Sequence, residues 1–155
     1  MNIGIYEDVI SGVDEYVEDI LAEGFEDVQL GHDLFKNVKA RGVDQLVMFL
    51  HQKYPMYKAD LNFVRKSPEN QEEPNFIHTD EMMGDLTAIL YLNKEHPKED
   101  GTTLYMGRNK MCILRSAYNR LIVFPSNLFH SRNIYENFGQ DDKARLIQVC
   151  FLKKV

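Results

Sequence analysis

The segment "FIHTD" contains two residues of types that commonly bind metals, His78 and Asp80, with one residue between them. Because residues at i and i+2 of a β-strand point to the same face, both side chains reach the same space. An imidazole and a carboxylate placed side by side can occupy two neighbouring coordination positions on a divalent metal ion. The spacing therefore predicts half of a metal site, and a third ligand has to come from elsewhere in the chain.

The third ligand is sought among the other histidines, which are His32, His51, His96 and His130. His51 falls within a predicted helix, and His96 lies in the polar segment "NKEHPKEDG". His130 follows "NRLIVFPSNLF", which has the character of a strand and a turn, and it stands 52 residues after His78. That interval can hold several antiparallel strands, so we expect His130 to complete the site.

Two histidines and one carboxylate on one face of a metal ion leave further positions open, which is the pattern of non-haem iron(II) oxygenases. The spacing alone is weak, because a His-x-Asp pair followed by another histidine arises easily by chance in 155 residues. A solvated His–Asp pair at the protein surface is the alternative interpretation. The surrounding sequence decides between the two.

From about Tyr57 to Leu152 the sequence resembles the double-stranded β-helix of the iron(II)- and 2-oxoglutarate-dependent oxygenases, especially the prolyl 4-hydroxylase-like branch. Five segments occur in the order found in that family: "HTD", "LTAILYLN", "EDGTTLY", "NRLIVFPSNLFH" and "ARLIQVCFL". Each segment is unspecific by itself, but their order is specific. The resemblance implies a catalytic iron(II) held by His78, Asp80 and His130.

The resemblance also implies roles for residues around the metal. Arg145 opens the last predicted strand, where the family places a basic residue that pairs with the far carboxylate of 2-oxoglutarate. The planar guanidinium of arginine can hold a carboxylate through two hydrogen bonds. Tyr91 matches a position whose hydroxyl often shares that carboxylate, and Thr87 lies four residues earlier on the same strand face. For the carboxylate nearest the metal, Asn62 and Arg65 are candidates.

The activity that the resemblance implies is hydroxylation of a C–H bond in a peptidyl or small amino-acid-like substrate, for which a prolyl residue is one candidate. The reaction consumes O2 and converts 2-oxoglutarate to succinate and CO2, and ascorbate is a candidate stimulant. Asp80 stands where halogenating relatives carry a small residue, so we expect no chlorination. The interval between His130 and Arg145 is longer than usual, which leaves open whether residues 131–144 form a lid.

Three other functions remain open. A nucleic-acid demethylase of the same fold would carry a second arginine six residues after the first, and Phe151 stands there instead. A cupin-like metal protein would favour His-x-His over the His-x-Asp of this chain. The third is a non-catalytic metal-binding or interaction module of the same fold, which conversion of 2-oxoglutarate to succinate would distinguish from an enzyme.

The elements that position these residues follow from hydrophobic spacing. Apolar residues at helical intervals predict helices within 7–24 and 43–54, and the segment between them is ambiguous. Seven or eight short runs rich in β-branched and aromatic residues follow. We expect one α+β domain over 1–155. Residues 1–56 would be mainly helical and pack on one sheet of a jelly-roll or cupin-like double-stranded β-helix formed by 57–155.

Composition sets the remaining expectations. The net charge of −6, without a cluster of Lys and Arg, argues against nucleic acid as a partner. We expect a small-molecule, peptide or protein substrate, and the oligomeric state is open. No segment approaches the roughly 20 apolar residues of a membrane span, and the N-terminal segment lacks a signal-peptide pattern. We therefore expect a cytoplasmic protein with no membrane partner, in which Cys112 and Cys150 are buried thiols.

Overall fold

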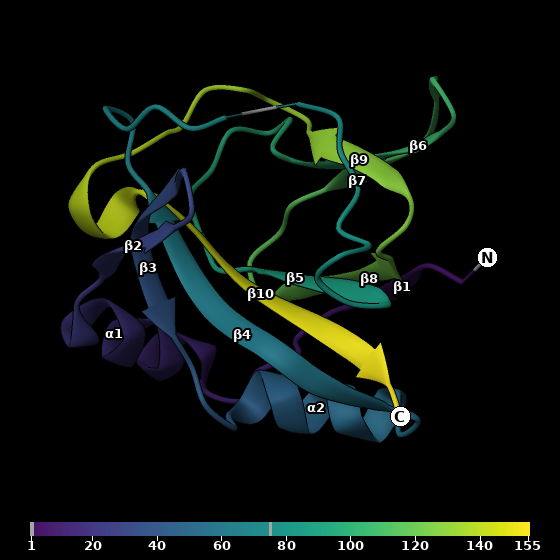
Figure 1. The fold of residues 1–155 in the computed structure, drawn as a ribbon. Helices are drawn as coiled ribbons and strands as arrows, with labels where there is room; N and C mark the ends of the chain where they lie inside the picture. Colours follow the sequence, from purple (N-terminus) through teal and green to yellow (C-terminus); the bar gives the residue numbers. More distant parts are fainter. Residues whose placement is uncertain (1, 75) are drawn as a thin grey trace.

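The computed structural model describes residues 2–74 and 76–155. In this part of the chain the elements are β1 (Gly4–Tyr6), α1 (Val13–Glu23), β2 (Glu26–Leu30), β3 (Asp33–Ala40), α2 (Gln45–Lys53), β4 (Tyr57–Ser67), β5 (Leu86–Tyr91), β6 (Gly101–Met106), β7 (Asn109–Arg115), β8 (Arg120–Pro125), β9 (Phe129–Arg132), the 3-10 helix η1 (Asp141–Lys143) and β10 (Arg145–Lys154). Figure 1 shows their arrangement.

The strands form two antiparallel sheets. The larger sheet has seven strands in the order β1-β8-β5-β10-β4-β3-β2, and the smaller has three in the order β7-β6-β9. The smaller sheet covers one face of the larger sheet, and α1 and α2 lie on the other face of the larger sheet (Figure 1). This arrangement is the predicted α+β jelly roll, or double-stranded β-helix, with supporting helices on one sheet.

The central strands of the larger sheet are apolar on both faces because each face packs against a different layer. On the helix side, β10 contributes Leu146, Cys150 and Leu152 to a core that includes Ile20 of α1 and Leu50 of α2. The alternate residues of β10 enter the core between the two sheets, and these are Ile147, Val149 and Phe151. The alternation along β10 thereby determines which of its side chains reach the space between the sheets.

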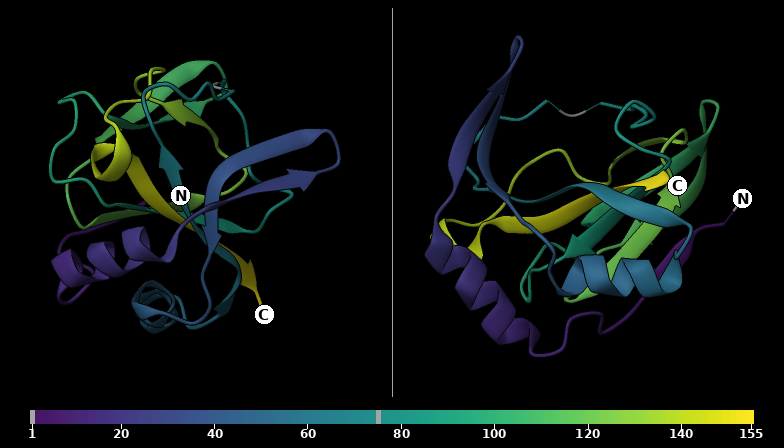
Figure 2. Two further views of the ribbon diagram at one scale, coloured as in Figure 1. Left: turned by 90° about the vertical axis from the view of Figure 1, so that its left-hand side faces the viewer. Right: turned by 60° about the horizontal axis from the view of Figure 1, so that its bottom comes forward.

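The region before β4 is less helical than predicted. β2 and β3 form a hairpin, and β3 pairs with β4 so that Val38 lies opposite Arg65. Residues 26–40 therefore extend the larger sheet, and Figure 2 shows the hairpin projecting away from the body of the protein. Most of the hairpin side chains are exposed, so its sequence shows neither the alternation of a half-buried strand nor helical spacing.

One boundary of each helix in the supporting layer has a local cause. Oδ1 of Asp44 accepts hydrogen bonds from the backbone N–H groups of Leu46 (3.1 Å) and Val47 (3.3 Å), which caps the start of α2. α1 ends before Gly24, whose φ of 81° favours glycine. Within residues 2–74 and 76–155, no helix is long and apolar enough to cross a membrane.

The two cysteines are both free thiols, but they differ in burial. Cys150 is buried in the core on the helix side, as expected. Cys112 is only partly buried, contrary to the expectation, because β7 is an edge strand of the smaller sheet. The two thiols therefore differ in their access to solvent.

Candidate metal centre

His78 and His130 lie directly opposite one another. The spacing argument treated "FIHTD" as part of a strand, but residues 76–80 lie outside the strands of the structure, and residue 75 before them lies outside the described residues. His78 instead forms an isolated antiparallel bridge with His130 of β9. Two backbone hydrogen bonds make the bridge, from His78 N to His130 O (3.0 Å) and from His130 N to His78 O (2.9 Å). The imidazole ring centroids are 4.4 Å apart. Strand pairing thus makes neighbours of two residues that are distant in the sequence.

The carboxylate of Asp80 lies against both imidazoles. Its Oδ1 is 3.4 Å from Nε2 of His78, and its Oδ2 is 3.0 Å from Nε2 of His130. One potential ligand atom from each of the three residues lies within 4.8 Å of the other two. The backbone N–H of Asp80 donates to the carbonyl of Ser126 (2.8 Å), which fixes this segment at the end of β8. The structure therefore brings together the three residues selected from the sequence.

Each imidazole has one ring nitrogen next to a backbone carbonyl. Nδ1 of His78 is 2.9 Å from the carbonyl oxygen of Phe76, and Nδ1 of His130 is 3.1 Å from that of Leu128. A protonated Nδ1 that donates to a carbonyl leaves the lone pair of Nε2 available for a metal. Two such nitrogens with one carboxylate form a donor set that fits iron(II).

The protonation of Asp80 also suits a metal ligand. Burial acts to raise the pKa of Asp80, but hydrogen bonds with His130 and His78 outweigh burial and hold that pKa well below its usual range. The same hydrogen bond with Asp80 raises the pKa of His78, and burial opposes it. Asp80 is therefore ionised at neutral pH, as a carboxylate that binds a metal has to be.

Thr87 supports Asp80, whereas the sequence analysis placed it at the far carboxylate of the co-substrate. Its Oγ1 is 3.4 Å from Oδ2 of Asp80 and 2.8 Å from Oγ of Ser126. Thr87 does share a strand face with Tyr91, but four residues of β-strand separate them by roughly 13 Å. The hydroxyl of Thr87 thus lies beside the candidate metal ligands.

The three candidate ligands line a cavity of about 230 Å³ between the two sheets. Its apolar wall includes Phe63, Phe76, Ile89, Ile147, Val149 and Phe151. Three arginines also line it: Arg65, Arg132 and Arg145. Apolar walls with a few convergent polar groups are typical of sites that bind small molecules.

Arg145 is buried at the start of β10, with a side chain that is 6% exposed. Its Nε lies 3.6 Å from Oδ1 of Asp100. Both atoms are buried and have no hydrogen-bond partner among the described residues. Leaving a buried charged donor unpaired costs more free energy than leaving a neutral one unpaired, so this guanidinium fits an incoming carboxylate. The cavity therefore contains a group suited to 2-oxoglutarate as well as a donor set suited to iron(II).

Tyr91 is connected to the cavity through Thr102. The hydroxyl of Tyr91 is 2.5 Å from Oγ1 of Thr102, and Thr102 is one of the residues that line the cavity. Burial raises the pKa of Tyr91 to about 12, so the hydroxyl stays protonated at neutral pH. The contact of Tyr91 with the co-substrate stays a prediction. Sequence reasoning missed Thr102, although it lies in "EDGTTLY", one of the five matching segments.

The two candidates for the carboxylate nearest the metal lie on opposite faces of β4. Arg65 lines the cavity, whereas Asn62 lines a separate cavity beside α2. Nδ2 of Asn62 donates to the carbonyl of Gly42 (2.9 Å), and its Oδ1 accepts from Gln148 (2.8 Å). Asn62 is therefore not a site residue. Residues three apart on a strand point to opposite faces, so only Arg65 enters the cavity. Arg65 lies opposite Ile147, at the end away from Thr87 and Asp80, so the register does not support its predicted contact with the carboxylate nearest the metal.

Arg132 and Glu73 are cavity residues that sequence reasoning missed. NH1 of Arg132 is 3.9 Å from Oε2 of Glu73 and donates to Oδ1 of Asn137 (2.7 Å). Burial, together with the nearby charge of Arg145, lowers the pKa of Arg132 to about 10. Nδ2 of Asn137 also donates to Oε2 of Glu73 (2.7 Å), which fastens the segment 131–144 to the edge of the cavity.

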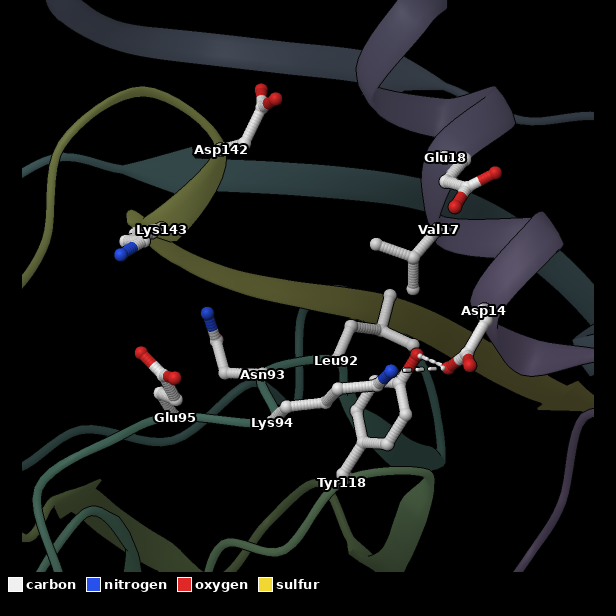
Figure 3. Close-up of a pocket in the computed structure, with 10 residues that line it drawn as sticks. All are labelled: Asp14, Val17, Glu18, Leu92, Asn93, Lys94, Glu95, Tyr118, Asp142 and Lys143. Atoms are coloured by element: carbon white, nitrogen blue, oxygen red, sulfur yellow. Dashed lines mark hydrogen bonds and ion pairs between the residues drawn. The ribbon is translucent and has the colours of Figure 1, made fainter.

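A second cavity, of about 270 Å³, lies outside the sheets next to α1 and η1 (Figure 3). Its charged groups pair near the surface: Asp14 Oδ1 lies 3.0 Å from Nζ of Lys94 and accepts a hydrogen bond from the hydroxyl of Tyr118 (2.7 Å). Lys94 and Asp14 have side chains that are 62% and 60% exposed. The residues that line this cavity include none of the three candidate metal ligands, so the cavity between the sheets is the candidate site.

The sequence matches no known protein-family profile, and no curated protein matches it. Solved structures do share its fold. The non-haem α-ketoglutarate-dependent epimerase SnoN from nogalamycin biosynthesis has a TM-score of 0.67 and 15% identity, over 96% of this chain and 76% of that one. A 2OG-Fe(II) oxygenase family oxidoreductase from Burkholderia pseudomallei has a TM-score of 0.62 and 12% identity, over 97% and 84%.

A third similar structure is the non-haem α-ketoglutarate-dependent carbocyclase SnoK, also from nogalamycin biosynthesis. It has a TM-score of 0.63 and 12% identity, and the alignment covers 97% of this chain and 78% of that one. At these identities the likeness establishes the jelly-roll fold, and the function has to be argued from the site.

Proposed function

We propose that the protein is an iron(II)- and 2-oxoglutarate-dependent dioxygenase that hydroxylates a C–H bond of a peptidyl or small amino-acid-like substrate. The observation that carries this proposal is the presence of two kinds of group in one cavity. His78, Asp80 and His130 form a donor set suited to iron(II). Arg145, which also forms an ion pair with Asp100, has a buried Nε without a hydrogen-bond partner among the described residues and is suited to a carboxylate. The names of the similar solved structures support 2-oxoglutarate-dependent chemistry in general, since they include an epimerase and a carbocyclase, and the hydroxylation is our own proposal.

The chain supplies ligands, orientation and a dry environment. His78, Asp80 and His130 would hold the metal, while Thr87 fixes the position of the Asp80 carboxylate. Arg145 would hold the far carboxylate of 2-oxoglutarate. Bound iron(II), with 2-oxoglutarate and O2, would supply the oxidising power for attack on a C–H bond. The apolar wall of the cavity would exclude water from the reacting groups.

The first experiment distinguishes an enzyme from a non-catalytic module of the same fold. The purified protein is incubated with iron(II), 2-oxoglutarate and O2, with and without ascorbate, and succinate is measured. We expect slow succinate formation that depends on iron(II) and is lost in Asp80→Ala. Lys94→Ala, which changes the cavity outside the sheets, is the matched control and should keep the wild-type rate. Absence of succinate from the wild type, with metal and 2-oxoglutarate bound, would favour the non-catalytic module.

The second experiment addresses the substrate. Peptides with and without a prolyl residue, together with free amino acids, are screened for stimulation of succinate formation. A true substrate should stimulate succinate formation and yield a product heavier by one oxygen atom in mass spectrometry. If prolyl peptides give no stimulation and another amino-acid-like compound does, the prolyl assignment is wrong and the proposed reaction type stands.

A further inference from the structure

The candidate site contains three arginines, whereas the proposed function uses only one of them, Arg145, to hold the co-substrate carboxylate. Arg65 comes from β4, Arg132 from β9 and Arg145 from β10, and all three line the cavity that the candidate metal ligands line. These strands belong to both sheets. The three guanidinium groups therefore converge on one space from separate parts of the fold.

Strand register places the arginines at one end of the cavity. On the larger sheet, Arg65 lies opposite Ile147, which lies opposite Tyr91. On the smaller sheet, Arg132 lies opposite Thr102, whose hydroxyl contacts that of Tyr91. The third arginine stands two positions before Ile147 on the same face of β10. We call this region, bordered by the three arginines, the arginine end of the cavity.

The candidate metal ligands lie at the other end. Asp80 contacts Thr87, and Thr87 lies opposite Phe151 of β10. Phe151 is six residues beyond Arg145 on the same strand. Six strand residues span roughly 20 Å of backbone, which is longer than 2-oxoglutarate. The arginine side chains, however, extend into the same cavity that Asp80 lines, so one extended dicarboxylate can meet both groups within it.

The three arginines at the arginine end carry one more formal charge than the carboxylates that pair with them among the described residues. Arg65 NH2 is 2.6 Å from Oε1 of Glu73, and Arg132 NH1 is 3.9 Å from Oε2 of the same carboxylate. Arg145 Nε is 3.6 Å from Oδ1 of Asp100. Two carboxylates thus face three guanidinium groups. One further carboxylate would balance the charge, and a second anion would find no counter-charge.

The arginine end also has hydrogen-bond donors without acceptors. Nε of Arg65, Nε of Arg132 and Nε of Arg145 are each buried without a hydrogen-bond partner among the described residues. A buried donor left unpaired is unfavourable, and a carboxylate oxygen is the strongest acceptor available to a guanidinium. The unpaired donors and the net charge point to the same kind of group.

We propose that Arg132 is a second co-substrate-binding residue, which holds the far carboxylate of 2-oxoglutarate together with Arg145. The inference rests on the proposed function. The occupant is the co-substrate because one carboxylate balances the charge, which leaves none for an anionic group of the primary substrate. Glu73 competes with that carboxylate for Arg132 and Arg65, since its own carboxylate lies between them.

The competing explanation is structural. Arg132 also donates to Asn137 and contacts Glu73, so it could serve only to fasten the segments around these residues. The two explanations predict opposite effects of Glu73→Gln. If Arg132 binds the co-substrate, removal of the Glu73 charge frees positive charge and tightens binding. If Arg132 only fastens the chain, Glu73→Gln and Arg132→Gln both loosen the cavity and weaken binding.

The experiment is isothermal titration of the full chain loaded with manganese(II), which replaces iron(II) without turnover. The ligands are 2-oxoglutarate and 2-oxobutyrate, which lacks the far carboxylate. Arg132→Gln should raise the Kd of 2-oxoglutarate about tenfold or more and leave that of 2-oxobutyrate within about twofold. Arg132→Lys, which keeps the charge but loses the planar fork, should fall between wild type and Arg132→Gln. Glu73→Gln should lower the Kd of 2-oxoglutarate.

The control is Lys94→Gln, which removes a positive charge at the second cavity, next to α1 and η1. Both Kd values should be unchanged in this variant. An unchanged Kd in both Arg132 variants, equal weakening for both ligands, or weakening in Glu73→Gln would each overturn the inference. If the wild type binds 2-oxoglutarate and Arg145→Gln weakens that binding, any of these three outcomes overturns only the role of Arg132, and the proposed function stands. If the wild type fails to bind 2-oxoglutarate, the proposed function fails and the inference fails with it.

Discussion

Asp80 and His130 are 50 residues apart in the sequence, yet Oδ2 of Asp80 is 3.0 Å from Nε2 of His130. The contact depends on backbone pairing as well as on the side chains. The N–H of Asp80 donates to the carbonyl of Ser126 at the end of β8, and β9 with His130 follows within a few residues. Both segments that carry candidate ligands are thus fixed to the same end of the jelly roll, which would preorganise the cluster for the proposed metal ion.

Replacement of Thr87 by Val should weaken metal binding about tenfold, because the Asp80 carboxylate loses an orienting hydrogen bond. The measurement is anaerobic titration of iron(II) against a competing chelator. Thr103→Val is the matched control. Thr103 is also buried, but its hydroxyl donates a hydrogen bond to Oδ1 of Asn133 and not to Asp80. Equal metal affinity in the Thr87 and Thr103 variants would show that Thr87 does not position Asp80.

Replacement of Arg145 by Gln should weaken 2-oxoglutarate binding by about 2–5 kcal/mol, because a buried carboxylate loses its charged partner. Isothermal titration of the metal-loaded protein measures the change. Arg120→Gln is the control, because Arg120 pairs with Glu7 away from the cavity. A variant with wild-type affinity for 2-oxoglutarate would remove Arg145 from the site.

The carboxylate of Asp80 should restrict the reaction to oxygen transfer. A halide needs a coordination position on the metal, and in this chain Asp80 would occupy one and repel a neighbouring anion. We expect a product heavier by one oxygen atom when turnover is run in chloride buffer, and mass spectrometry distinguishes it. A chlorinated product would contradict the assignment of Asp80 as a direct ligand.

Cys150 should be inert to thiol reagents in the folded protein. Burial, with a smaller effect of the Asp44 charge, raises its pKa to about 12. Because only the thiolate reacts, the reactive fraction at pH 8 is about one in 10,000. In Cys112→Ser, the rate of labelling should rise with pH without levelling near 9, and it should jump on unfolding in denaturant. Fast labelling of this variant at pH 8 in the folded state is the contrary result.

Sequence patterns located the candidate ligands because each ligand lies in a short segment that resembles the corresponding segment of the oxygenase family. "NRLIVFPSNLFH" predicted the strands that position His130, whereas "FIHTD" identified the ligand pair although His78 lies in an isolated bridge and not in a strand. Thr102, Arg132 and Glu73 were missed because their place in the cavity depends on pairing between distant segments. Arg132 faces Thr102 through the β6–β9 register, which no local pattern specifies.

Two errors have identifiable physical causes. The β2–β3 hairpin was not assigned because its side chains are mostly exposed, so that hydrogen bonds to β4 and not hydrophobic spacing define it. Asn62 was named beside Arg65, although two residues three positions apart on a strand cannot share a face. That signal was present in the sequence and would have excluded Asn62.

The most direct test of the central claim is the stoichiometry of metal binding. The wild type and Asp80→Ala, His78→Ala and His130→Ala are titrated with iron(II) under anaerobic conditions. We predict one iron(II) per wild-type chain, weaker binding in every variant, and 2-oxoglutarate binding that requires the metal. If the wild type binds no iron(II), or if the three variants bind it as tightly as the wild type, then His78, Asp80 and His130 do not form the metal site.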